Sequence, residues 1–184
     1  YNGHPFVVGA DMDLRRIDTA VRTAKQHGCL PIALAALEGQ GSAVLLQSAH
    51  QNWLYDAGAR FSSDADAGAR IIVPHLRYIG VTHIDTLVLS HNDSDHTGGA
   101  RSILNALPVQ RVMTSLNQMQ REALGLSQTT VSECVVGQIE QFDGVRMAVL
   151  SPDAQTLNAE NVPDNQKSCV LRFAVQSNQP NALK

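Results

Sequence analysis

The sequence predicts an α/β fold. Short apolar runs typical of strands alternate with segments that carry helix start and stop signals, and turn residues separate neighbouring strand-like runs. The chain has 184 residues, 43% of them hydrophobic and 17% charged, which suits one compact domain or part of a larger one. No apolar run approaches the roughly 20 residues of a membrane helix, so we expect the chain itself to be soluble.

The first expected elements are a helix and a hairpin. Asp13 is a suitable N-cap for a helix that runs to His27, and Gly28 follows as a stop signal. Residues 42–47 and 52–56 are predicted to be two strands that pair through the short connection between them.

The middle of the chain predicts a helix, a buried strand and a second helix. Residues 74–80 favour a short helix with proline in its first turn, and 85–90 form a short apolar run typical of a buried strand. A helix then starts after Gly98 and Gly99 and stops at Pro108. Further strands are expected at 110–115, 131–136, 138–144, 145–152 and 168–175.

Two connections between predicted strands lie in the last third of the chain, one a tight turn and the other a longer polar segment. Asp143 and Gly144 lie between β-prone segments, which is a hairpin signal. Residues 153–167 are polar, so we expect a mobile loop there.

A dense group of histidines and acids follows the buried strand 85–90, in the sequence His-Asn-Asp-Ser-Asp-His at 91–96. The carboxyl end of a strand before a helix is where α/β sheets commonly place ligand sites. Imidazole and carboxylate without thiolate favour a hydrolytic zinc or manganese site. A divalent ion there would offset the carboxylate repulsion and lower the pKa of a bound water to about 7. Adjacent ligands at Asp95 and His96 point in different directions, which favours two metals over one.

Composition gives no support to nucleic acid as a partner. The formal charge is −3 and only 4% of residues are aromatic, so neither a basic surface nor a base-stacking surface is indicated. The alternative for any single histidine or aspartate is a solvated side chain, and we apply it to His4, His27, His50, His75 and His83.

The stretch Leu87–Gly99 resembles the metal-binding loop of the metallo-β-lactamase fold, with Asp93 where the usual pattern has a second histidine. That replacement is typical of the extracytoplasmic domain of the ComEC competence proteins, which take up transforming DNA. The resemblance covers residues 39–175, and besides the loop four segments carry it: 39–46, 54–91, 133–152 and 164–173.

The resemblance implies an αββα sandwich and a two-metal hydrolase site. His91 and Asp93 would bind the first metal, manganese or zinc, and Asp95 and His96 the second. Asp95 and Asp56 are the residues expected to act in catalysis, Asp56 by orienting a ligand. The family is thought to degrade one DNA strand outside the inner membrane while the other strand crosses through a separate membrane channel domain.

The resemblance assigns residues 39–184 to the metallo-β-lactamase-like domain and leaves 1–38 unassigned, with one helix. Family members carry further ligands in Thr-Gly-Asp and His-His-Gly-Ser segments, and this chain reaches neither. We therefore expect a fold missing its C-terminal part, metals held weakly or not at all, low nuclease activity and a tendency to self-associate.

Cys134 and Cys169 lie on predicted strands in segments that resemble a periplasmic domain, which favours a disulfide between them. Buried free thiols are the alternative, and either way Cys29 has no partner in the chain.

Two other functions remain open at this point. A hydrolase of lactones or thioesters would use the same loop but an enclosed pocket, whereas a catalytically inactive binding module would hold metal poorly.

Overall fold

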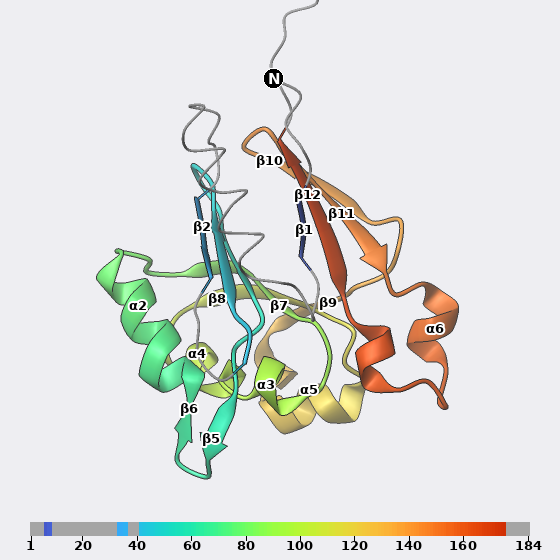
Figure 1. Cartoon of the computed structure of the whole chain (residues 1–184), viewed down its shortest axis with the longest axis horizontal. Helices are drawn as coiled ribbons and strands as arrows, with labels where there is room; N and C mark the ends of the chain where they lie inside the picture. The colour runs from blue at the N-terminus through green and yellow to red at the C-terminus, as the bar shows by residue number, and fades with distance from the viewer. Residues whose placement is uncertain (1–5, 9–32, 37–40, 176–184) are drawn as a thin grey trace, which may run out of the picture.

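Two β-sheets packed face to face form the centre of the protein (Figure 1). The computed structural model describes residues 6–8, 33–36 and 41–175. The predicted helix from Asp13 to His27, and Cys29, lie outside the described residues. No helix among the residues described is long and apolar enough to cross a membrane.

The larger sheet has six strands in the order β2-β3-β4-β7-β8-β9. From β4 to β9 all neighbours are parallel, whereas β2, β3 and β4 are antiparallel. The strands are β2 (Ala33–Ala36), β3 (Val44–Gln47), β4 (Asn52–Tyr55), β7 (Ile84–Leu89), β8 (Val109–Thr114) and β9 (Thr130–Glu133).

The smaller sheet is antiparallel, in the order β1-β12-β11-β10. Its strands are β1 (Phe6–Val8), β10 (Ile139–Phe142), β11 (Val145–Ser151) and β12 (Val170–Val175). As the Asp-Gly signal predicts, β10 and β11 turn at Asp143 and Gly144, which both have positive φ. The first 38 residues, which the sequence analysis leaves unassigned, contribute β1 to this sheet and β2 to the larger one.

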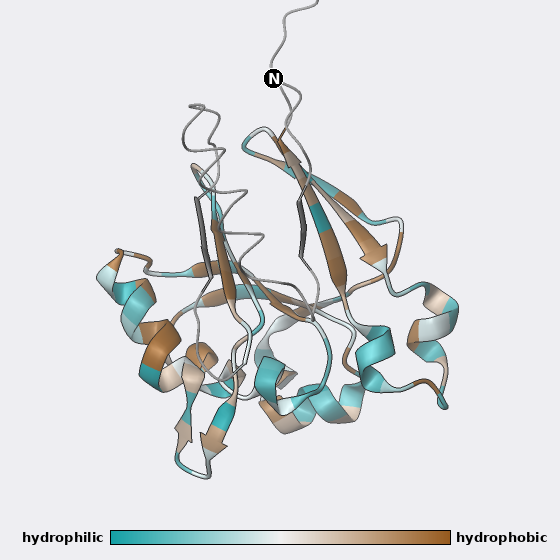
Figure 2. Cartoon of the chain, in the orientation of Figure 1, coloured by the Kyte–Doolittle hydropathy of each residue, from teal (hydrophilic) through white to brown (hydrophobic). Residues whose placement is uncertain are grey.

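Successive side chains of β3 and β4 point to opposite faces of the larger sheet, so each face carries its own apolar layer. Leu45 and Leu54 face helices, whereas Val44, Leu46 and Trp53 face the smaller sheet. This is the period-2 pattern of a sheet that is covered on both faces. Figure 2 shows the resulting brown strands, with hydrophilic helices such as α3 at the lower rim.

The helices are short. A β5–β6 hairpin (Arg60–Ser62, Ala65–Asp66) leads into a π-helix η1 (Gly68–Ile72) and α2 (Val73–Tyr78), which pack on the larger sheet with α4 (Ala100–Ala106). The remaining helical segments are α3 (Ser94–Thr97), α5 (Gln118–Leu124), η2 (Leu126–Gln128), α6 (Ala154–Asn158) and η3 (Asp164–Lys167).

The mobile loop expected at 153–167 is not a loop throughout, because the helical segments α6 and η3 lie within it. The side chain of Asp153 accepts a hydrogen bond from the Thr156 N–H at 2.7 Å and so caps α6. Polarity predicts exposure here but does not exclude a capped turn of helix.

The predicted disulfide is confirmed. Cys134 and Cys169 are bonded, with a Cα–Cα distance of 5.7 Å. Cys134 follows β9 of the larger sheet and Cys169 precedes β12 of the smaller one, so the bond joins the two sheets.

Reducing this bond should destabilise the domain. A crosslink between residues 35 apart contributes about 3–4 kcal/mol in the chain-entropy model. Urea unfolding of the oxidised and the reduced protein should differ by about that amount. A Cys29→Ser variant should show the same difference, and equal stability with and without reductant would contradict the prediction.

Candidate metal centre

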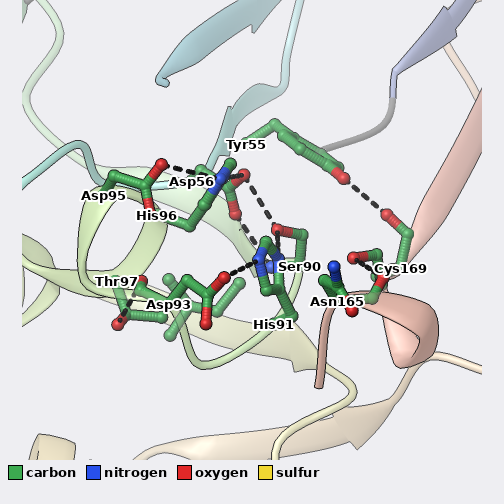
Figure 3. Close-up of polar contacts among 12 residues, drawn as sticks. Tyr55, Asp56, Ser90, His91, Asp93, Asp95, His96, Thr97, Asn165 and Cys169 are labelled. Carbon is green, nitrogen blue, oxygen red and sulfur yellow. Dashed lines mark hydrogen bonds and ion pairs between the residues drawn. The ribbon is translucent and has the colours of Figure 1, made fainter. Parts of the chain in front are cut away.

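The predicted site residues lie together at the edge where the parallel strands of the larger sheet end (Figure 3). Because β4 and β7 are parallel, their carboxyl ends meet at this edge. Asp56 directly follows β4, and the segment from Ser90 to His96 directly follows β7. Residues 34 or more apart in sequence therefore become neighbours.

Asp56 is completely buried, with an exposed fraction of 0%. Its backbone has a φ of 59°, a left-handed conformation that costs on the order of 1 kcal/mol for a residue with a side chain. Its Oδ1 accepts from the Ser90 N–H at 2.8 Å, and its Oδ2 accepts from the Ser90 hydroxyl at 2.9 Å. His96 Nδ1 lies 2.8 Å from the same Oδ2. The carboxylate is thus satisfied inside the protein.

These contacts determine which nitrogen of each histidine is free. A carboxylate only accepts, so His96 carries its proton on Nδ1. The Ser90 hydroxyl uses its proton on Asp56, so it accepts from His91 Nδ1, 3.0 Å away. Both histidines therefore present Nε2 outwards, as histidines do when the other nitrogen is held by a supporting hydrogen bond.

Each free nitrogen faces a carboxylate. His91 Nε2 lies 3.1 Å from Asp93 Oδ2, and His96 Nε2 lies 3.3 Å from Asp95 Oδ2. The two rings are close, with centroids 4.3 Å apart. A lone pair that faces a carboxylate oxygen is repulsive unless a proton or a metal ion lies between them, so the donor chemistry fits divalent cations.

The side chains form two pairs rather than one four-ligand cluster. Across residues 6–8, 33–36 and 41–175, no three His, Cys, Asp or Glu side chains converge on a common ion position. The pairs are nevertheless the same as those assigned above to the first and second metals. That these residues bind metal stays a prediction.

Burial and charge shift the pKa values of the buried pair. Complete burial raises the pKa of Asp56, against the opposing effect of hydrogen bonds from His96 and Ser90. Burial alone would lower the pKa of His96, but the hydrogen bond to Asp56 and the charges of three carboxylates raise it overall. Without metal, His96 therefore takes up a proton readily, and metal and proton compete for its Nε2.

Two glycines, Gly41 and Gly98, allow the segment that carries the metal-type ligands to approach the backbone of neighbouring segments closely. A Cβ at Gly98 would lie 2.1 Å from the Arg60 nitrogen, and one at Gly41 would lie 2.3 Å from the Asp95 carbonyl oxygen. The Ser42 N–H donates to that carbonyl at 3.1 Å. Close backbone approach thus fixes the start of α3, which carries Asp95 and His96.

Sequence reasoning missed Ser90. It is fully buried and contacts both Asp56 and His91. The available signal was a hydroxyl at the end of an apolar run, immediately before the first histidine of the cluster.

An Asp56→Asn variant should bind metal about 10–100-fold more weakly, the usual effect of losing a supporting partner. The amide can donate to His96 Nδ1, which favours the tautomer with its proton on Nε2, the nitrogen needed for metal. Zinc titration monitored by calorimetry would measure this.

Asp66→Asn is the matched control, because Asp66 accepts from the Ala69 N–H and from the Ser102 hydroxyl in a different part of the fold. Equal affinities for the two variants would show that Asp56 does not position a metal ligand.

The family model for the metallo-β-lactamase superfamily matches residues 36–131. The competence protein ComA of Neisseria gonorrhoeae is 35% identical over 134 residues, which are 73% of this chain and 17% of that protein. Recombination protein 2 of Haemophilus influenzae is 33% identical over 133 residues, which are 72% of this chain and 15% of that protein. The chain thus spans less than a fifth of the length of these relatives.

A solved structure shows the same fold at low identity. MEM-A1, a subclass B3 metallo-β-lactamase isolated from a soil metagenome library, aligns with a TM-score of 0.51 and 16% identity over 82% of this chain and 57% of that one. The chain therefore belongs to the metallo-β-lactamase superfamily, and its expected relationship to the ComEC competence proteins is confirmed.

Proposed function

We propose that this chain is the hydrolytic domain of a DNA-uptake protein and cleaves phosphodiester bonds with the help of divalent metal ions. The observation that carries the proposal is the pair of histidine–carboxylate contacts on Nε2, held by Asp56 and Ser90. Members of this superfamily are typically metal-dependent hydrolases, and the relatives are named for competence and recombination.

Two sites would be formed by the residues present. His91 and Asp93 would hold one ion, zinc or manganese, and Asp95 and His96 the other. Bound there, the ions would polarise a phosphoryl oxygen and acidify a water molecule. The protein's own contribution is positional: Asp56 and Ser90 fix both rings from behind, so little reorganisation is needed at the reacting edge.

The surroundings of the site favour a polar substrate over a lactone or thioester. A cavity of about 310 Å³ opens beside His91, and only Leu116 and Leu157 of its 13 lining residues are apolar. An acyl chain would bury little apolar surface there, whereas a nucleotide can form hydrogen bonds with many of the lining side chains.

The polar cavity and the relationship to competence proteins together suggest the partners of this domain. One DNA strand would be the substrate, degraded at the extracytoplasmic face of the inner membrane, while the other strand would pass to the membrane channel domain of the same kind of protein. Self-association remains a prediction from the sequence.

We expect Asp95→Ala to lose metal relative to Ser94→Ala. Asp95 faces the free nitrogen of His96, whereas Ser94 is exposed at the start of the same helix. Metal content by mass spectrometry, after loading with zinc and after a chelator wash, would separate the two variants. Equal content, or no metal in the parent protein, would contradict a metal centre here.

Single-stranded DNA should be degraded slowly with added manganese or zinc and not after chelation. Only one histidine and one carboxylate reach each proposed ion among the residues described, and a loose metal geometry can cost about 100-fold in rate. Asp95→Ala should abolish the activity, whereas Ser94→Ala should retain it.

The two alternative functions, a small-molecule hydrolase and an inactive binding module, predict different results in the same assays. Metal-dependent opening of an acyl lactone or cleavage of a thioester, without DNA cleavage, would favour the small-molecule hydrolase. Tight DNA binding without cleavage at any metal concentration would favour the binding module.

A further inference from the structure

The cavity beside His91 shares only that residue with the two histidine–carboxylate pairs. It is bounded by the loop after β7, by the β8–α5 connection, and by α6 and η3. Its volume of about 310 Å³ is at the small end of ligand pockets, so it can admit one nucleotide but not both strands of a duplex.

Three of the four fully charged side chains that line the cavity are already occupied. Arg121 lies 3.3 Å from Glu133, and its Nε donates to the Leu116 carbonyl oxygen. Asp164 accepts from Gln120 at 2.8 Å. These contacts tie α5 to β9 and to η3; the charges of Arg121 and Glu133 offset each other, and Asp164 leaves one negative charge on the lining.

Lys167, at the end of η3, is different. Its Nζ donates to the Ala159 carbonyl oxygen at 2.6 Å. No acid within the described part of the chain lies within ion-pair distance of it. An ammonium group has three donors, so two remain for a ligand on the same cavity wall.

We propose that this cavity binds one nucleotide of single-stranded DNA next to the scissile bond, and that Lys167 binds its phosphate. The inference rests on the function proposed above. His91 lines the same cavity, so a strand whose phosphodiester lies at the histidine–carboxylate pairs would place a neighbouring nucleotide there. The exposed carboxamides of Asn92, Gln118 and Asn158 also line it and can bond to a base edge.

A local cation is needed because the chain as a whole is acidic, with a formal charge of −3. Long-range attraction therefore does not bring DNA to the site. Each lysine–phosphate contact on a single strand contributes about 0.7 to the slope of log affinity against log salt concentration. A merely structural lysine would leave that slope unchanged.

The test is binding of a fluorescent single-stranded oligonucleotide to the full chain in the presence of chelator, measured by anisotropy over a range of salt concentrations. Lys167→Gln keeps a hydrogen-bond donor for Ala159 and removes the charge, so it should flatten the slope by about 0.7. Lys167→Arg should keep the slope. Arg146→Ala, on β11 of the smaller sheet and away from the cavity lining, is the matched loss of charge and should also keep it.

Equal slopes for Lys167→Gln and the parent, with DNA cleavage intact in the parent, would overturn the cavity assignment and leave the proposed function standing. A parent chain that neither binds nor cleaves single-stranded DNA would overturn both. A slope that falls equally in Lys167→Gln and Arg146→Ala would show only nonspecific attraction and would also overturn the assignment.

Discussion

A carboxylate buried without water must be fully hydrogen-bonded, and the site is built around that requirement. Asp56 has no exposed surface, and Ser90 and His96 together satisfy it with three contacts. Because Ser90 also contacts His91, one buried charge sets the orientation of both histidines. Loss of any member would leave a buried polar group without a partner, which costs more than the bond itself contributes.

The parallel order of the strands makes this network possible. The carboxyl ends of β4, β7, β8 and β9 meet at one edge, and β12 starts beside them, where the Cys169 N–H donates to the Ser90 carbonyl oxygen at 2.9 Å. Segments that carry ligands, cavity walls and the disulfide therefore share a single rim. The fold brings these polar groups together while the apolar layers on both faces of the sheet remain intact.

Much of this rim could be predicted from the sequence, because its signals are local. An apolar run followed by six residues with four metal-type ligands shows both the strand and the cluster, and Asp-Gly marks the β10–β11 turn. Asp56 required the family resemblance, since a lone aspartate after a strand has no distinctive spacing. The tautomers, the role of Ser90 and the cavity depend on contacts between distant segments. Polarity alone misassigned 153–167, where capping stabilises helices too short to show periodicity.

The two sheets are joined in different ways at their two ends. At the rim the bond between Cys134 and Cys169 is covalent. At the opposite end, Asp143 accepts from the Ser48 hydroxyl and the His50 N–H and pairs with the His50 ring at 2.7 Å. These contacts lower the pKa of Asp143 to about 2, so they persist to low pH, but they are noncovalent and the His50 side chain is exposed to solvent. Under oxidising conditions, a denaturant would therefore open the domain from the hairpin end first, and the rim with its disulfide would be the last part to separate.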